Sequence, residues 1–220
     1  MSSLASNLQD VKARIHRACE AASRHPDSVE LLAVSKHHLI EAIRELANLG
    51  VKRFGENYVQ EGSSKALALP DLEFVFIGPL QRNKAKPALT HFREIMTLDR
   101  PDLATRLRHI AQELDVVRSV WIQVDLWDEA TKVGGCTAEA IPTILEALGR
   151  DPRLPLRGFM VIPPPHRPEA FREISQLRET WQQKTGTQLL LSMGMSHDLE
   201  AAVQAGADQV RIGTALFGDR

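Results

Sequence analysis

The sequence predicts one α/β domain, a single (β/α)8 TIM barrel with an extra helix at its N-terminus. Short apolar runs alternate along the chain with amphipathic stretches, and this alternation is typical of a parallel sheet. Eight such runs follow one another without a long interruption in 220 residues, which favours closure into a barrel. An open, doubly wound sheet is the alternative architecture. We therefore assign residues 1–220 to a single domain.

The first element is a helix that we expect from Leu4 to Ser23, within an N-terminal segment (residues 1–24) that packs on the barrel. Its apolar residues recur at helical spacing and form one face: Leu8, Val11, Ile15 and Ala18. The sequence His25-Pro26-Asp27 ends the helix, because a proline disfavours helical geometry in the residue before it.

Eight apolar runs are the expected strands, and each of the first seven precedes a predicted helix. The strands are Leu31–Ser35, Arg53–Gly55, Phe74–Gly78, Glu94–Leu98, Val120–Asp125, Gly158–Ile162, Leu189–Ser192 and Gln209–Ile212. The stretches 46–55 and 202–211 resemble each other, and each fits a helix, a C-terminal glycine and a strand. This similarity supports a chain built from repeated units.

Composition excludes several classes of protein. The formal net charge is −1, and Lys and Arg are dispersed, unlike the basic footprint of a nucleic-acid binder. Cys19 and Cys136 lie far apart, which argues against a disulfide framework or a zinc ribbon and fits a reducing compartment. No two of the eight histidines fall in a metal-ligand motif. Since neither a signal peptide nor a membrane span is evident, we expect a cytoplasmic protein without a metal.

Lys36 is the first candidate functional residue. It ends the first predicted strand, and the carboxyl ends of the strands form the active face of such barrels. Partial desolvation at the barrel mouth favours the neutral amine of a lysine, which is the form that reacts with a carbonyl to give a Schiff base. A solvated lysine at a strand end is the plainer alternative.

A second group of candidates follows the last two strands. Ser192, Gly194 and Ser196 follow the seventh strand, and Gly213 and Thr214 follow the eighth. Barrels often bind phosphate at these two loops, where small residues let backbone N–H groups approach the oxygens. Two conventional tight turns would also explain these residues.

Together, the lysine and the phosphate loops suggest a ligand that is a phosphorylated carbonyl compound. Pyridoxal 5′-phosphate (PLP) and the substrate of a sugar-phosphate aldolase both fit. Arg211, two residues before the proposed phosphate loop, favours PLP because it can point inward at a ring nitrogen.

Six ordered motifs extend this interpretation over nearly the whole chain. They are Ala33-Val34-Ser35-Lys36, Phe54-Gly55-Glu56-Asn57-Tyr58-Val59-Gln60-Glu61, Phe76-Ile77-Gly78-Pro79-Leu80-Gln81 with Asn83-Lys84, Leu156-Arg157-Gly158-Phe159-Met160, Leu191-Ser192-Met193-Gly194-Met195-Ser196 with Asp198, and Val210-Arg211-Ile212-Gly213-Thr214 with Phe217-Gly218. In these motifs the chain resembles the pyridoxal phosphate homeostasis protein family, a single-domain relative of the N-terminal barrel of alanine racemase.

The resemblance implies a role for each matching residue. Lys36 corresponds to the lysine that carries PLP as an internal aldimine, and Arg211 to the partner of the pyridine nitrogen. Ser196, Gly213 and Thr214 correspond to phosphate ligands, with Ser192 nearby, and Asn57 to a wall of the cofactor site. Lys132 matches a further family lysine.

Two residues depart from the family pattern. Val75 stands where the family often has a histidine, and Asp125 stands where it often has an asparagine. An added carboxylate near the cofactor would alter its polarity. Neither change touches the lysine or the phosphate ligands, so we expect these departures to tune PLP binding without removing it.

The same residues favour a carrier over an enzyme. An arginine at the pyridine nitrogen leaves the ring a weak electron sink, because the guanidinium keeps its own proton. Racemisation also needs a second base. Alanine racemase takes that base from a C-terminal domain for which this chain has no room, and Tyr58 is the only tyrosine. We expect a monomer that buffers PLP or delivers it to apo PLP-dependent enzymes. A weak racemase is the alternative, and a Schiff-base aldolase without PLP is the third possibility.

Overall fold

Eight parallel strands form a closed barrel in the computed structural model, which describes residues 3–127, 134–164, 167 and 169–218. The strands are β1 (Glu30–Val34), β2 (Arg53–Glu56), β3 (Glu73–Phe76), β4 (Glu94–Leu98), β5 (Ser119–Val124), β6 (Leu156–Val161), β7 (Leu190–Ser192) and β8 (Gln209–Ile212). Each strand pairs in parallel with the next one along the chain, and β1 pairs with β8. The predicted barrel is therefore confirmed, and the open sheet is wrong.

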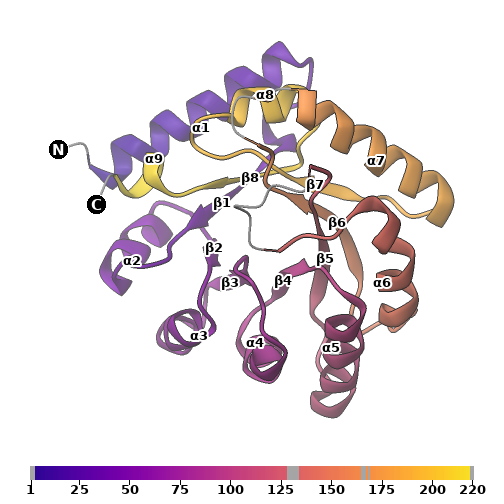
Figure 1. Ribbon diagram of the computed structural model, residues 1–220. Helices are drawn as coiled ribbons and strands as arrows, with labels where there is room; N and C mark the ends of the chain where they lie inside the picture. The colour runs from indigo at the N-terminus through magenta and orange to yellow at the C-terminus, as the bar shows by residue number, and fades with distance from the viewer. Residues whose placement is uncertain (1–2, 128–133, 165–166, 168, 219–220) are drawn as a thin grey trace.

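Helices surround the ring of strands (Figure 1). After the N-terminal α1 (Leu4–Ala21) they are α2 (Ile40–Asn48), α3 (Val59–Ala68), α4 (Ala85–His91), α5 (Pro101–Leu114), α6 (Ile141–Leu148), α7 (Glu169–Thr185), α8 (Leu199–Gln204) and α9 (Thr214–Phe217). A helix follows each of the first seven strands, as predicted. Proline opens α5 at Pro101, where its missing N–H has no partner to lose.

Helix α1 covers the last β/α unit, lying along α8 and α9 (Figure 1). Asn7 donates a 2.8 Å hydrogen bond to the carbonyl oxygen of Leu216, and Arg14 forms a bidentate ion pair with Glu200 at 2.7 and 2.9 Å. The helix ends at Ala21, before the predicted Ser23. Ser23 has a left-handed φ of 54°, so the backbone leaves helical geometry earlier than the following proline requires.

The repeated helix–glycine–strand unit is confirmed at both places where the sequence predicts it. Gly50 and Gly206 each have φ of 95°, the left-handed geometry that glycine adopts without a steric penalty. After each glycine, an N–H group bonds back over the helix end: Val51 to the carbonyl of Leu46, and Ala207 to that of Ala202. These are the bonds that end a helix in a Schellman motif.

Several strands end earlier than the sequence indicates, and this places key residues in turns. Strand β1 ends at Val34, so Ser35 starts the following turn, and β3 ends at Phe76 before Gly78. The ladder still continues for one hydrogen bond past each end, from Ser35 N–H to the carbonyl of Gly55 at 2.9 Å and from Ile77 N–H to that of Glu56 at 2.9 Å. Backbone hydrogen bonding thus extends one residue past the last residue of β1 and of β3.

Two apolar regions fill the molecule. The larger one lies between the strands and the surrounding helices, with Phe54, Phe74 and Ile95 among its fully buried members. A smaller one, here called the inner apolar layer, fills the barrel interior with Leu32, Val75, Met96, Trp121 and Met160. Because this layer fills the centre of the barrel, the interior is a packed core and not a channel.

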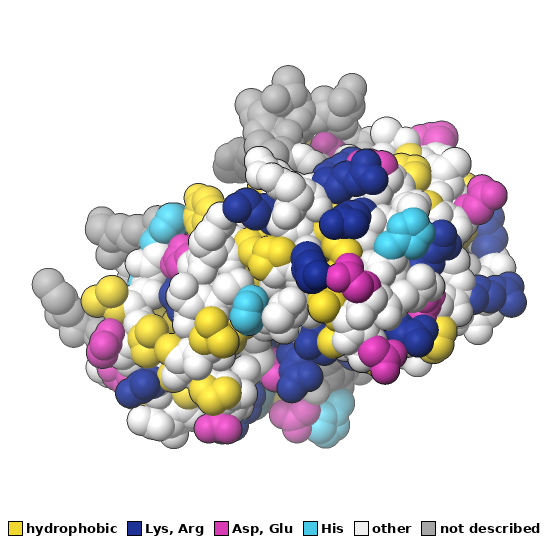
Figure 2. All heavy atoms as spheres, turned by 90° about the horizontal axis from the view of Figure 1, so that it is seen from below, with side chains coloured by type: hydrophobic (Ala, Val, Ile, Leu, Met, Phe, Trp, Pro, Cys, Tyr) yellow, Lys and Arg dark blue, Asp and Glu magenta, His cyan; other side chains and the backbone are white. Residues whose placement is uncertain are grey.

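Charges of both signs are interspersed on the surface. On the face shown in Figure 2, Lys and Arg side chains alternate with Asp and Glu, and no single-sign patch dominates. In the part of the chain that the structure describes, no helix combines the length and apolar character needed to cross a membrane.

Candidate functional site

A pocket of about 260 Å³ opens at the carboxyl ends of the strands. Its lining comes from loops and strand ends all around the barrel: Val34, Lys36, Asn57, Ile77, Met160, Ile162, Met195, Ser196, His197, Arg211, Gly213 and Thr214. Six of the seven predicted cofactor-binding residues are in this set. The structure therefore brings together residues that lie as far apart as 36 and 214 in the sequence.

Lys36 lies in a tight turn directly after β1. The N–H of His38 donates a 3.0 Å hydrogen bond to the carbonyl of Ser35, and His37 adopts a left-handed φ of 65°. Such geometry is uncommon for a residue other than glycine. The turn reverses the chain immediately after the strand, so Lys36 is half-buried at the pocket while His37 faces solvent.

Arg211 is the buried positive charge of the pocket. Its guanidinium donates to the carbonyl oxygens of Ser192 at 2.6 Å and Val161 at 2.7 Å, and to the hydroxyl of Ser192 at 2.9 Å. Among the described residues no carboxylate forms an ion pair with it. Burial lowers the pKa of Arg211 to about 10, although Asp198 acts in the opposite direction. The group therefore keeps its charge at neutral pH.

Asn57 supplies the next polar group of the lining, from the loop after β2. Its side-chain oxygen Oδ1 is buried and has no hydrogen-bond partner among the described residues. A side chain at Gly78 would collide with the Asn57 backbone, since an added Cβ would lie 2.0 Å from the Asn57 carbonyl oxygen. Glycine at position 78 thus lets the loops after β2 and β3 meet and holds Asn57 in the lining.

Small and hydroxyl residues form the side of the pocket after β7 and β8. Ser196 accepts a 3.3 Å hydrogen bond from the N–H of Ala215 through its Oγ, which joins the two loops. Gly194 has φ of 92°, and a Cβ there would lie 2.5 Å from the Cβ of Ala202. Only glycine fits this position, which lies two residues before Ser196 in the loop after β7, and the Gly194 carbonyl accepts a 3.0 Å hydrogen bond from the N–H of Arg211.

Ser192 is the predicted residue that the structure does not bring to the pocket surface. It is completely buried and donates a 2.8 Å hydrogen bond to Oε1 of Gln209, while its hydroxyl and carbonyl oxygens accept from Arg211. Its position is behind Arg211, where it supports the guanidinium. Lys132, the further lysine implied by the resemblance, lies outside the described residues.

Apolar side chains make up the part of the lining that sequence analysis missed. Ile77, Met160 and Ile162 come from the ends of β3 and β6, and Met195 from the loop after β7. The period-two alternation of inward-facing residues along a strand is the signal that would have indicated Met160 and Ile162. These side chains make much of the pocket wall apolar.

Neither departure from the family pattern lines the pocket. Val75 is fully buried in the inner apolar layer. Asp125 accepts a 3.1 Å hydrogen bond from the N–H of Trp127 and borders a separate hollow with Gly135 and Glu139. The expectation of an added carboxylate beside the ligand therefore receives no support from the lining.

Cys136 does not have the setting of a reactive thiol. Burial raises its pKa to about 12, and the carboxylate of Asp99 acts in the same direction. The thiol is therefore almost fully protonated at neutral pH, as expected for an inert cysteine. Within the described ranges, no group of three His, Cys, Asp or Glu side chains is placed to hold a metal ion.

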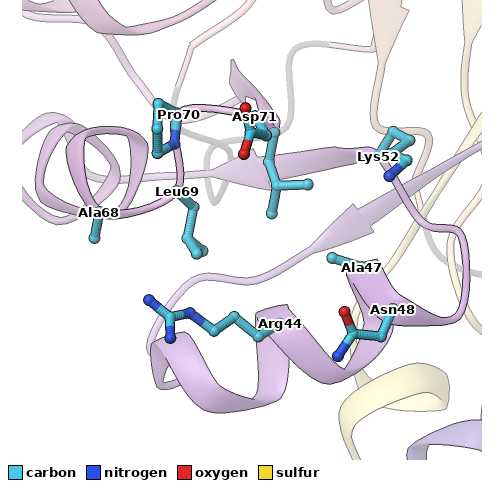
Figure 3. A pocket seen from close by; sticks show the side chains of 9 residues that line it. Arg44, Ala47, Asn48, Lys52, Ala68, Leu69, Pro70 and Asp71 are labelled. Carbon is cyan, nitrogen blue, oxygen red and sulfur yellow. The ribbon is translucent and has the colours of Figure 1, made fainter.

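A second hollow lies at the opposite end of the barrel, between α2 and the loop before β3. Figure 3 shows Arg44 and Asn48 reaching from α2, with Pro70 and Asp71 across the hollow from them. The amino ends of parallel strands in such barrels serve stability more than chemistry. The pocket around Lys36, with its buried cation and unsatisfied amide oxygen, is therefore the candidate site.

Fold and pocket together define a barrel of the type found at the N-terminus of alanine racemases. The family model for the alanine racemase N-terminal domain matches residues 6–220. Alanine racemase from Clostridium difficile superposes with a TM-score of 0.79 over 99% of this chain and 56% of its own, at 15% identity. That likeness shows the fold alone.

More similar relatives narrow the class. A Pseudomonas aeruginosa protein named pyridoxal phosphate homeostasis protein is 44% identical over 100% of this chain and 97% of its own length. One of the same name from Aquifex aeolicus is 42% identical over 97% and 96%. The chain belongs to the family of pyridoxal phosphate homeostasis proteins. PipY of Synechococcus elongatus, solved with PLP bound, has a TM-score of 0.85 at 36% identity and covers 98% of this chain and 100% of its own.

Proposed function

We propose that this chain binds PLP covalently through Lys36 and serves PLP homeostasis, buffering or delivering the cofactor without turning over a substrate. One observation carries the proposal: Lys36 lines a single pocket together with a buried Arg211, with which no carboxylate among the described residues forms an ion pair. The chain that builds this pocket is 36% identical to PipY, whose structure was solved with PLP bound.

The pocket has the chemistry that an anionic, hydrogen-bonding ring would need. Arg211 brings a positive charge that no carboxylate among the described residues pairs with. Asn57 brings a buried oxygen that no described residue hydrogen-bonds, and a buried polar atom left unsatisfied costs free energy. Both groups gain partners when an anionic ligand with polar ring substituents enters, while Ile77 and Met160 offer apolar surface to the ring.

Each residue of the lining has a defined part in this proposal. The aldehyde of PLP, when bound, supplies a carbon that forms a Schiff base with a lysine amine. Lys36 presents that amine, and Arg211 faces the pyridine nitrogen. Ser196, Gly213 and Thr214 hold the phosphate with hydroxyl and backbone N–H groups. Asn57 forms one wall of the cofactor site.

Two features support a carrier over an enzyme. The Arg211 guanidinium remains protonated at neutral pH, so it accepts no proton and gives none to the ring nitrogen, unlike the carboxylate that makes PLP a strong electron sink. Tyr58 is 51% exposed and packs against the ring of His37, with ring centroids 5.0 Å apart. It therefore points to solvent from outside the lining.

Delivery needs a pocket that other amines can reach. Thr214, His197 and Met195 line the pocket and are exposed, so an incoming amine can approach the bond at Lys36. We propose that a monomer in the cytoplasm passes PLP to apo PLP-dependent enzymes. The free, buried thiols of Cys19 and Cys136 suit a reducing compartment.

The test is an absorption spectrum of the purified protein with added PLP, followed by borohydride reduction and peptide mapping. We expect a band at about 420 nm that reduction traps on Lys36, and in Lys36→Ala no such adduct at position 36 with the fold retained. A missing band would refute PLP binding and would redirect the search to phosphorylated sugars. Alanine racemisation at the rate of a true racemase would refute the carrier role alone.

A further inference from the structure

A buried cluster of charges lies under the turn that carries Lys36, outside the pocket lining. At its centre is Lys65 of α3, whose Nζ donates to the carbonyl oxygen of Ser35 at 2.7 Å, to Oε1 of Glu56 at 2.8 Å and to Oε1 of Glu61 at 2.7 Å. An ammonium group has three N–H donors. All three are therefore occupied, and each acceptor belongs to a different element around the turn.

This cluster holds the turn on both sides of Lys36. On the N-terminal side, Ser35 has its carbonyl fixed by the central ammonium, and its hydroxyl donates a 2.6 Å hydrogen bond to Glu56. On the C-terminal side, the N–H of His37 donates to Oε1 of Glu61, and the His37 ring lies within 3.8 Å of the same carboxylate. The left-handed backbone of His37 is thus held in place by a charged acceptor.

Stability alone does not explain so costly an arrangement. Lys65 is 5% exposed and Glu56 is completely buried, and taking both charges out of water costs about as much as their attraction returns. Burial raises the pKa of Glu56, while the hydrogen bonds from Lys65 and Ser35 oppose that rise. A buried ion cluster gives directional bonds, and here three of them converge on residues 35 and 37.

We propose that Lys65 is a positioning residue for Lys36: with Glu56 and Glu61 it fixes the turn so that the Lys36 amine stays aimed into the pocket. Its own N–H groups are used by three acceptors, so it supports Lys36 and does not replace it. This inference rests on the proposed function, and it assigns to the cluster a role in the rate of bond formation at Lys36.

The test separates the positioning of Lys36 from the shape of the pocket. Glu61→Gln removes the negative charge of the carboxylate that accepts hydrogen bonds from Lys65 and from the His37 N–H. Because this side chain is partly exposed, we expect the variant to fold. Bond formation is followed by stopped-flow absorbance at about 420 nm after mixing ligand-free protein with PLP. Binding without the bond is measured with pyridoxine 5′-phosphate, which has an alcohol in place of the aldehyde. We expect bond formation to slow roughly 10- to 100-fold, with pyridoxine 5′-phosphate affinity within about twofold of wild type.

Two further variants and one control test the same role of Lys65. Lys65→Met is expected to slow bond formation at least as much as Glu61→Gln, and Lys65→Arg, which keeps the charge, to recover part of the rate. Glu113→Gln is the matched control, because it removes the exposed ion pair with Lys86 far from the turn, and it is expected to change neither measurement.

The outcomes distinguish this inference from the proposed function. A wild-type protein that binds neither PLP nor its alcohol refutes the proposed function. A wild-type protein that forms the bond, together with a Glu61→Gln variant of equal rate, refutes only the positioning role. Parallel loss of rate and of pyridoxine 5′-phosphate affinity would also overturn it, because the cluster would then serve the pocket as a whole.

Discussion

The two ends of the barrel interior each hold an arginine, and they satisfy it in different ways. At the amino ends of the strands, Arg53 forms ion pairs with Glu30, with Glu73 at 3.2 Å and with Glu94 at 2.7 Å. At the carboxyl ends, Arg211 donates to main-chain carbonyl oxygens of β6 and β7 and to a hydroxyl group. One arginine has several carboxylate partners, and the other has none among the described residues.

This difference appears in the acidity of the two groups. Burial would lower the pKa of Arg53, but Glu94 and Glu30 outweigh it and hold that pKa above its ordinary value. Burial dominates at Arg211 and lowers its pKa to about 10. A buried cation with which no carboxylate among the described residues forms an ion pair is costly for the protein alone, and this supports the proposal that an anionic ligand completes the site. A cation with three carboxylates is complete already.

Arg53→Met gives the largest effect expected from this comparison. It leaves Glu94, whose side chain is 7% exposed, without its main partner, and removing one member of a buried pair costs about 3 kcal/mol or more. Chemical denaturation should show this loss, while PLP affinity, measured by absorbance titration, stays within about twofold. A matching loss of affinity would contradict the division between the two ends.

Arg211→Met should have the opposite profile. A hydrogen bond to a charged group contributes about 1.5–3 kcal/mol, so PLP affinity should fall roughly 10- to 100-fold, with a smaller loss of stability than in Arg53→Met. Arg44→Met is the control, because Arg44 is an exposed arginine at the other hollow. If Arg211→Met and Arg44→Met lowered PLP affinity equally, the effect would come from the change in net charge and not from the site.

A pH series sharpens the comparison at the turn. Burial would raise the pKa of Glu61, but hydrogen bonds from Lys65 and from the His37 N–H outweigh it and hold the pKa below 4.5. Because the folded-state pKa is depressed, the stabilisation is present above pH 4.5 and is lost as the pH falls through the folded-state value. Glu61→Gln should therefore be less stable than wild type at pH 7, by roughly 1 kcal/mol or less. Denaturation curves of the two proteins should converge below pH 4.5, and a gap that persists there would contradict this assignment.

The smallest expected effect concerns Cys136, whose thiol should not be alkylated in the native protein. A pKa of about 12 leaves almost no thiolate at pH 8, and the thiolate is the reactive form. Iodoacetamide should therefore leave this residue unmodified in the native protein and label it after unfolding, as peptide mapping by mass spectrometry would reveal. Rapid labelling of native protein would mean that the carboxyl end of the barrel is more open than the structure indicates.

The fold could be predicted from the sequence because the alternation of apolar runs with amphipathic stretches, and the residues that favour turns, are local signals. The eight apolar runs and the glycines at positions 50 and 206 are each recognised from a few neighbouring residues. The position of Lys36 followed from the same signals, because the end of β1 fixes where the turn begins. Errors lay at the ends of elements: α1 ends at Ala21 before the predicted Ser23, and Ser35 and Gly78 lie past the ends of β1 and β3.

Contacts between elements could not be predicted in this way. Ser192 occupies a strand position that fits an inward-facing residue, yet the long side chain of Arg211 from the neighbouring strand lies over it. Glu61 and Lys65 are four residues apart, and helical spacing alone indicates that they pair. Their meeting with Glu56 and Ser35 depends on how α3 packs against β1 and β2, which no local pattern contains.

The inner apolar layer separates the two charged ends of the barrel interior. Trp121 contacts the ionic end, donating a 2.7 Å hydrogen bond to Glu94, and Met160 contacts the other end as part of the pocket lining. Between them lie the apolar side chains of Leu32, Val75 and Met96, which carry no charge and no strong hydrogen-bonding group, so these side chains do not join the two arginines into one hydrogen-bonded network. Substitutions at the Arg53 end can therefore change the stability of the barrel, and substitutions at the Arg211 end its affinity for a ligand, nearly independently of each other.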